Sequence, residues 1–212
     1  MDRKLLSSVV LLMSCAVILS VAAHLFIVFP FDLTITGEIQ EQQSPVFAGT
    51  MQLVSEPGDI RLEALLIGTV MAIFLVRRQR VEALFVLATA SAIVLTGVLK
   101  VLVSRPRPPS FAANPSTFFW SADQYSFPSG HVVFYVVFFG FIAFLAWSFL
   151  AGYRRWVVIA ACGLLIVLIA PSRVYLGAHW ASDVIGSYVI GMLWLIMIIL
   201  GYLMAKTRFP GE

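Results

Sequence analysis

The chain has 212 residues, of which 60% are hydrophobic and 12% are charged, and its formal net charge is +3. So few charged residues cannot cover the apolar surface of a protein in water, which excludes a soluble globular protein and predicts a membrane protein. This length accommodates about six membrane helices of roughly 20 residues each. No separate soluble segment is visible, so we expect a single membrane domain over residues 1–212.

Six apolar runs are candidate membrane helices, and the expected fold is an all-α bundle of six transmembrane helices. The runs are Leu5–Phe29, Ile60–Val76, Val81–Val103, His131–Leu150, Trp156–Ala170 and about Ala181–Ala205. Basic residues precede the first run, as they do in a signal peptide, but a run of roughly 25 residues is too long for the apolar core of such a peptide. We therefore expect the first run to remain as a membrane span.

Two connections between these runs are long. Residues 30–59 contain several carboxylates and are predicted to form an outer loop that includes a short amphipathic helix. Residues 104–127 are rich in proline and carry aromatic side chains that either anchor the loop at the lipid headgroups or border a lipid entrance. These aromatic residues are Phe111, Phe118, Phe119 and Trp120.

Basic residues are divided unevenly between the two ends of the runs. Nine of the 14 flank the ends on one side: Arg3, Lys4, Arg77, Arg78, Arg80, Arg154, Arg155, Lys206 and Arg208. By the positive-inside rule this side faces the cytoplasm, which places both termini inside. The other five face outside, and all except Arg61 belong to, or touch, three polar motifs.

The first polar motif extends from Lys100, at the outer end of the third run, to Arg107 and Pro108. Pro106 and Pro108 end the helix and stiffen the segment around Arg107. A planar guanidinium and a compact ammonium complement each other in binding a phosphate dianion. A basic cluster at a helix end is more often an anchor at lipid headgroups, and Arg105 either joins the phosphate-binding cations or lies on the rim.

The second motif, Pro128-Ser129-Gly130-His131, directly precedes the fourth run. Free backbone N–H groups at the start of a helix favour anion binding. The alternative is an ordinary N-terminal cap made by Ser129. His131 favours the anion site, because an imidazole beside a bound anion can deliver a proton to a leaving oxygen.

The third motif joins Ser172 and Arg173 to His179 and Asp183. With a helix from about Gly177, His179 and Asp183 lie four residues apart on one face, where the carboxylate can reach the imidazole. A carboxylate on one ring nitrogen leaves the other free to attack, as a nucleophilic histidine requires. The alternative is a structural His–Asp hydrogen bond, which leaves Arg173 unexplained. The fifth run is short for a layer of about 30 Å, so Ser172 and Arg173 are expected slightly below the membrane surface.

In order and spacing, the three motifs resemble the signature of the type 2 phosphatidic acid phosphatase superfamily, which also includes vanadium-dependent haloperoxidases. The resemblance covers residues 100–108, 128–131 and 172–183, and the six-span outline is similar to that of bacterial membrane phosphatases of this family. It implies that the phosphate ligands are Lys100, Arg107, Ser129, Gly130 and Arg173. It implies that the catalytic residues are His179 as nucleophile, Asp183 as the group that orients it and His131 as the acid that protonates the leaving group.

The resemblance thus implies hydrolysis of the terminal phosphate of a membrane lipid through a phosphohistidine, with no metal or cofactor. Undecaprenyl diphosphate, phosphatidylglycerophosphate and phosphatidic acid are candidate substrates that the sequence does not separate. The expected location is the cell membrane, with the active site at the outer membrane–water interface and facing the periplasm or exterior. The alternatives are a lipid phosphotransferase with the same histidine chemistry and a non-catalytic lipid-binding or transport protein. Membrane lipids are the expected partners; neither nucleic acid nor an obligate protein partner is expected.

Overall fold

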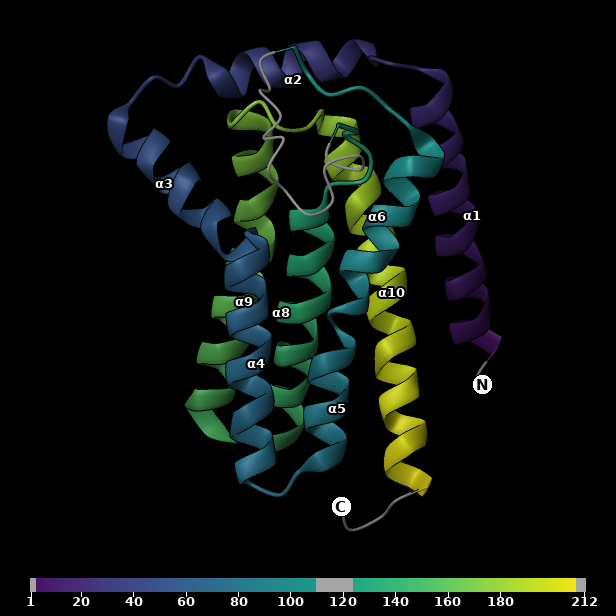
Figure 1. Ribbon diagram of the computed structural model, residues 1–212, viewed down its shortest axis with the longest axis vertical. Helices are drawn as coiled ribbons and strands as arrows, with labels where there is room; N and C mark the ends of the chain where they lie inside the picture. The colour runs from purple at the N-terminus through teal and green to yellow at the C-terminus, as the bar shows by residue number, and fades with distance from the viewer. Residues whose placement is uncertain (1–2, 110–123, 209–212) are drawn as a thin grey trace.

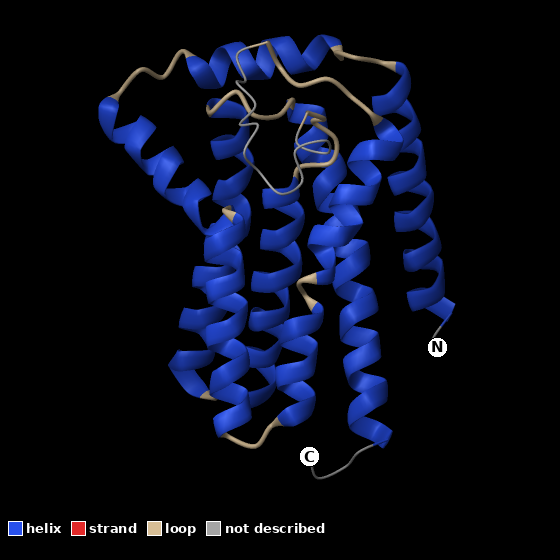
Figure 2. Cartoon of the chain, viewed as in Figure 1, coloured by secondary structure: helices blue, strands red, loops and turns tan. Residues whose placement is uncertain are grey.

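The computed structural model describes residues 3–109 and 124–208, and within these ranges the chain consists of helices and loops (Figure 2). The long helices run side by side, and two shorter helices lie at one end of the bundle (Figure 1). The all-α prediction is confirmed for the described residues. Both interpretations of the aromatic loop stay predictions, because Phe111, Phe118, Phe119 and Trp120 lie outside the described ranges.

The helix boundaries follow the apolar runs closely. In chain order the elements are α1 (Arg3–Leu25), α2 (Pro30–Gln40), α3 (Pro45–Ser55), the 3-10 turn η1 (Glu56–Gly58), α4 (Ile60–Val76), α5 (Arg80–Ala88), α6 (Ser91–Val103), α8 (Gly130–Phe149), α9 (Gly152–Tyr175) and α10 (Ala181–Arg208). Segment 30–59, predicted as a loop with one short helix, contains α2, α3 and η1. Pro30 and Pro45 each begin a helix, where a missing backbone N–H costs nothing.

Five described segments are long and apolar enough to cross a membrane: α1, α5 together with α6, α8, α9 and α10. The remaining predicted span is the second run, Ile60–Val76, which forms α4 and has 17 residues. At 1.5 Å per residue, α4 is about 26 Å long, less than a hydrocarbon layer of about 30 Å. The chain is therefore a multi-pass membrane protein, and the number of six spans remains a prediction.

The fifth span is longer than its apolar run indicates. α9 has 24 residues and continues to Tyr175, so the prediction of a short span ending near Ala170 is wrong. Pro171 lies inside this helix, where proline removes a backbone hydrogen bond. The hydroxyl of Ser172 donates to the Met51 carbonyl at 2.6 Å and ties this turn to α3. Ser172 and Arg173 therefore belong to the last turns of α9.

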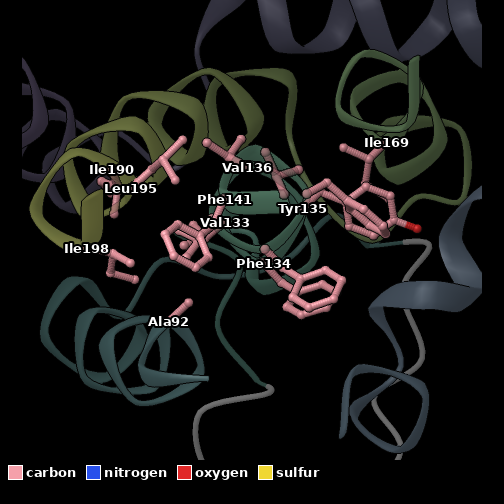
Figure 3. Packing of buried hydrophobic residues seen from close by; sticks show 14 of the residues in the cluster. Ala92, Val133, Phe134, Tyr135, Val136, Phe141, Ile169, Ile190, Leu195 and Ile198 are labelled. Carbon is pink, nitrogen blue, oxygen red and sulfur yellow. The ribbon is translucent and has the colours of Figure 1, made fainter. Parts of the chain in front are cut away.

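Helix α8 lies at the centre of the bundle, where its side chains are buried on all sides from Val132 to Phe139. Figure 3 shows its side chains beside those of two other helices: Ile169 of α9, and Ile190, Leu195 and Ile198 of α10. At Gly191, an added Cβ would lie 2.9 Å from the Val136 Cβ. Such glycine contacts let membrane helices pack closely, and they fix α8 against α10.

The two ends of the bundle differ in charge. The α4–α5 and α8–α9 connections, the start of α1 and the end of α10 point toward one end, the lower end in Figure 1. The nine basic residues counted above flank these elements. Helix α2 lies across the opposite end, and α3 leads back from it to η1 and α4 (Figure 1). The three polar motifs lie toward this α2 end.

A buried carboxylate joins α5 to α10 toward the lower end. Glu82 is fully buried, and its Oε1 accepts from the Tyr202 hydroxyl and the Lys206 ammonium, each at 2.9 Å. Replacing Tyr202 with phenylalanine removes one donor from a buried acceptor and is expected to destabilise the fold by about 1–3 kcal/mol. The measurement is the thermal midpoint in detergent. An unchanged midpoint would show that the hydrogen bond contributes nothing.

Candidate active site

The residues of the three motifs come together at the α2 end of the bundle, where α6 ends, α8 begins, α9 ends and α10 begins (Figure 1). The positive charges of Lys100, Arg107 and Arg173 act on the imidazole rings of both His179 and His131. Residues from three distant segments of the chain therefore form one electrostatically coupled cluster. The expected phosphate ligands and both histidines lie in or beside it.

His179 lies in the turn between α9 and α10 and is 2% exposed. Its Nδ1 is 2.7 Å from the Ser126 carbonyl oxygen, which can only accept, so Nδ1 carries the proton. In the neutral ring the lone pair is then on Nε2, which lies 3.5 Å from Nη1 of Arg107. Burial, followed by the charges of Arg107, Arg173 and Lys100, holds the pKa of His179 well below its ordinary value. The imidazole is therefore neutral near pH 7, with its lone pair on the Arg107 side.

Asp183 lies near His179, but its contacts differ from those predicted. Because α10 begins after His179, the prediction that both residues share one helical face is wrong. Nδ1 of His179 is 3.8 Å from Oδ2 of Asp183, which is too long for a hydrogen bond. Oδ2 accepts from the Trp180 N–H at 2.9 Å, and Oδ1 accepts from Nη1 of Arg105 at 2.5 Å. The Nδ1 proton goes instead to the Ser126 carbonyl, which belongs to none of the three motifs.

Arg173 is buried and has one nitrogen without a partner. Its Nη1 donates to Ser55 Oγ at 2.5 Å, whereas its buried Nε has no hydrogen-bond partner among the described residues. Buried N–H groups are nearly always paired, so this atom indicates a position for an acceptor. Arg107 donates from Nη1 to the Ala178 carbonyl at 2.8 Å, and Lys100 is buried in the last turn of α6. These three cations could hold a dianion beside His179.

Ser129 and Gly130 lie at the start of α8, as predicted. Ser129 Oγ accepts from the Val132 N–H at 3.5 Å, which is the capping contact expected in the alternative interpretation. The backbone N–H of Ser129 donates to Ser187 Oγ at 2.7 Å. The hydroxyl of Ser129 accepts a hydrogen bond in the cap, and its proton can still donate to another group. A Cβ added at Gly130 would meet only Thr96 Oγ1, at 3.8 Å. The structure therefore leaves room at this helix start.

His131 follows in the first turn of α8 and is half-buried. The turn η1 packs directly on its ring: a Cβ added at Gly58 would lie only 2.3 Å from His131 Cδ2. Any side chain at Gly58 would therefore displace the imidazole. The absence of a side chain at Gly58 therefore lets the imidazole of His131 pack against η1.

Segment 30–59 contributes residues that the sequence analysis did not identify. Besides Gly58, these are Ser55, which accepts from Arg173, and Asp32, whose Oδ2 accepts from Nη2 of Arg105 at 2.9 Å. Asp32 is fully buried. A carboxylate between apolar neighbours in a chain with few charges was a usable signal for Asp32. Ser55 and Gly58 have no comparable signal, because their roles depend on contacts with distant helices.

Comparison with known proteins gives a consistent result. A sequence model described as the PAP2 superfamily matches residues 81–207, which contain all three motifs. A solved structure of similar fold is described as the crystal structure of the first transmembrane PAP2 type phosphatidylglycerolphosphate phosphatase from Bacillus subtilis. It is 26% identical in sequence with a TM-score of 0.79, and the alignment covers 95% of this chain and 98% of that chain.

Two curated relatives have more similar sequences over shorter stretches. Phosphatidylglycerophosphatase B of Bacillus subtilis (strain 168) is 35% identical over 118 residues, which are 54% of this chain and 54% of that protein. Undecaprenyl-diphosphatase of Sulfolobus acidocaldarius is 32% identical over 124 residues, which are 58% of this chain and 56% of that protein. The matched stretch thus spans about half the length of these relatives.

Proposed function

Since the chain belongs to the PAP2 superfamily, we propose that it is a lipid phosphate phosphatase that removes the terminal phosphate of a membrane lipid. One observation carries the proposal: Nη1 of Arg107 lies 3.5 Å from Nε2 of the buried His179 imidazole, which the positive charges of Arg107, Arg173 and Lys100 help to keep neutral. Cations of both types bind phosphate, and a neutral imidazole can act as the nucleophile. The names of the relatives, a phosphatidylglycerophosphatase and an undecaprenyl-diphosphatase, support this class of substrate.

In this proposal the terminal phosphate binds among the three cations. Arg173 offers an Nε–H that has no partner within the described part of the chain. Nη1 of Arg107 is 3.5 Å from Nε2 of His179, so a phosphate bound to this arginine lies beside the nucleophile. Ser129 and Gly130 would add hydrogen bonds from the start of α8. Burial of the site strengthens each of these charge-assisted contacts.

The proposed reaction has two displacements at phosphorus. His179 Nε2 attacks the terminal phosphorus, and the bond to the bridging oxygen breaks. His131, which holds a proton once the bound phosphate dianion offsets the positive charges around it, gives that proton to the bridging oxygen. A water molecule then attacks the phosphohistidine and gives its proton to His131, now neutral, as the P–N bond breaks and inorganic phosphate is released. Asp183, at 3.8 Å, stabilises the positive charge of the phosphorylated ring by attraction across a short gap. The Ser126 carbonyl keeps the Nδ1 proton in place. No metal is proposed for either step.

The proposed orientation follows from the two ends of the bundle. The end that carries most of the basic residues faces the cytoplasm, with both termini, under the positive-inside rule. The α2 end then faces the periplasm or exterior and meets the headgroups of the outer leaflet. This accords with a substrate that is itself a membrane lipid.

The experiment is phosphate release from a panel of lipid phosphates by the purified protein in detergent with a metal chelator present. The panel contains phosphatidylglycerophosphate, phosphatidic acid and undecaprenyl diphosphate. We expect release from at least one of them that the chelator does not reduce. Analysis of the products separates hydrolysis from phosphotransfer, because a transferase yields a phosphorylated acceptor in place of inorganic phosphate. Absence of both products with every lipid would refute the proposed function and favour a non-catalytic lipid-binding protein.

Replacing Gly58 with alanine is expected to lower kcat by about 100-fold, because a displaced acid is poorly aligned with the leaving oxygen. The added Cβ lies 2.3 Å from His131 Cδ2, so the imidazole must move. Gly68→Ala is the matched control, since a Cβ added there meets nothing within 4 Å. If both variants retain wild-type kcat, η1 does not position His131.

A further inference from the structure

Arg105 is the most deeply buried arginine of the described chain, at 1% exposure, and the proposed reaction does not use it. Its Nη1 donates to Ser182 Oγ at 2.7 Å and to Asp183 Oδ1 at 2.5 Å. Its Nη2 donates to Asp32 Oδ2 at 2.9 Å, and its Nε donates to the Ile27 carbonyl at 3.0 Å. Every nitrogen of the guanidinium is therefore engaged. Burial of an arginine is costly unless it is paired in this way.

The backbone directs Arg105 toward Asp183. Ser104 adopts a left-handed conformation, with φ of 54°, and ends α6 one residue before Arg105. Arg107 approaches the Nε2 side of His179 from the same short segment, while Arg105 holds the carboxylate near Nδ1. The two arginines of the first motif thus have different partners. Arg107 lies next to Nε2 of His179, the attacking nitrogen, whereas Arg105 binds the Asp183 carboxylate near Nδ1.

The same segment also fixes the other partner of His179. The Ser126 N–H donates to the Arg105 carbonyl at 2.8 Å, and the Ser126 carbonyl lies 2.7 Å from Nδ1 of His179. Both residues on the Nδ1 side of the ring, Ser126 and Asp183, are therefore bonded to Arg105. One bond is made by its backbone and the other by its side chain.

Asp32 completes the arrangement from α2. Its carboxylate accepts from Arg105, from the Ser182 N–H at 2.8 Å and from the Ser182 hydroxyl at 2.8 Å. It also accepts from the Phe29 N–H at 3.0 Å. Both members of each ion pair, Arg105–Asp32 and Arg105–Asp183, have side chains that are 0% exposed. Asp32 therefore holds the guanidinium at Nη2 while Asp183 accepts from Nη1, and Asp32 also binds the first turn of α10, on which Asp183 lies.

We propose that Arg105 and Asp32 are positioning residues, which set the orientation of Asp183 and through it the charge stabilisation of His179. The proposal rests on the proposed phosphatase function for its kinetic consequences. Removing the guanidinium leaves Asp183 Oδ1 without its charged partner, and the carboxylate can then rotate away from Nδ1. The three cations of the phosphate site are untouched by this change, so the effect falls on turnover and not on binding.

The kinetic test uses dioctanoyl phosphatidic acid as a dispersible substrate. Arg105→Gln is expected to lower kcat by about 100-fold, as misplacement by about 1 Å does, with KM changed less than about threefold. Arg105→Lys keeps the charge and is expected to recover about tenfold of this loss, while Asp32→Asn is expected to lose about tenfold, as supporting residues of a site do. An effect confined to KM would overturn the proposal, because it would place Arg105 among the phosphate ligands.

A double variant tests whether Arg105 acts through Asp183. If it does, Arg105→Gln has little further effect on kcat in an Asp183→Asn background. Equal losses in both backgrounds would overturn the proposal. Glu82→Gln is the matched control for lost stability, because it disrupts another ion pair with a buried carboxylate near the far end of the bundle. It is expected to lower the thermal midpoint and leave kcat of the folded protein unchanged.

A spectroscopic measurement separates failure of this proposal from failure of the proposed function. The protein has three histidines, so ring nitrogen signals of His179 can be assigned by comparison with His179→Ala. We expect Arg105→Gln to shift these signals and Glu82→Gln to leave them in place. If wild type releases no phosphate from any lipid, the proposed function fails, yet the signals still report on Arg105. Unshifted signals in Arg105→Gln would refute the positioning role whatever the activity.

Discussion

Replacing His179 with alanine is expected to lower kcat by roughly 10⁴-fold or more, the scale seen when a nucleophile is removed. The side chain is buried, with Nδ1 held by the Ser126 carbonyl and Nε2 beside Arg107. In the proposed reaction no other described side chain supplies the attacking nitrogen. The measurement is phosphate release under saturating lipid, beside the trapping of a phosphoenzyme from labelled substrate in rapid-quench experiments.

The phosphoenzyme is the sharper of the two readouts. Wild type is expected to form an acid-labile, alkali-stable phosphoryl adduct, as phosphohistidine is, and His179→Ala to form none. His24→Ala serves as the control histidine variant, because its Nδ1 lies 2.9 Å from the Val103 carbonyl and the proposed reaction does not use it. An adduct of undiminished yield in His179→Ala would move the nucleophile to another residue.

Replacing Arg173 with alanine is expected to lower kcat/KM by about 10²–10³-fold, the loss that follows removal of one preorganised donor. Arg173 is buried and presents an Nε–H with no partner among the described residues. Arg173→Lys keeps the positive charge but lacks the planar guanidinium with its paired N–H donors. It is therefore expected to retain only part of the wild-type kcat/KM that the alanine variant loses. The measurement is kcat/KM together with the dissociation constant of inorganic phosphate.

Arg61→Ala is the matched control for Arg173, since it removes the same charge from an exposed position at the start of α4. It is expected to retain activity within about twofold, because screened surface charges contribute little. Equal effects of the two substitutions would mean that only overall charge matters. The thermal midpoint of each variant shows whether lost packing with Ser55 contributes to the Arg173 result.

The positions of the long helices could be predicted from the sequence because a membrane span requires a long apolar run. The same requirement explains why the predicted end of the fifth span was wrong. The run from Trp156 to Ala170 stops at Pro171, but α9 continues through this proline to the polar residues of its last turns. Apolar composition marks the part of a helix in lipid, whereas the end of the helix is set by tertiary contacts such as that of Ser172 with α3.

The clustering of the site residues could likewise be predicted, because cations and imidazoles are rare in an apolar chain and lie at helix ends on one side. Their individual contacts could not. Arg105 and Asp183 are 78 positions apart in the chain, and Arg105 and Asp32 are 73 apart. No local pattern encodes such a pairing. The sequence leaves Arg105 open between phosphate binding and the rim, but in the structure its guanidinium binds Asp183 and Asp32.

The bonds between Asp32 and Ser182 join residues 150 positions apart, which has a consequence for biosynthesis. Translation proceeds from the N-terminus, so α2 is synthesised before the intervening spans and before α10. The bonds between Asp32 and Ser182 can form only after α10 has been inserted. Until then Arg105 has neither its Ser182 nor its Asp183 contact. A nascent chain that lacks its last helix therefore has an incomplete site, and catalytic competence arises only when membrane insertion is finished.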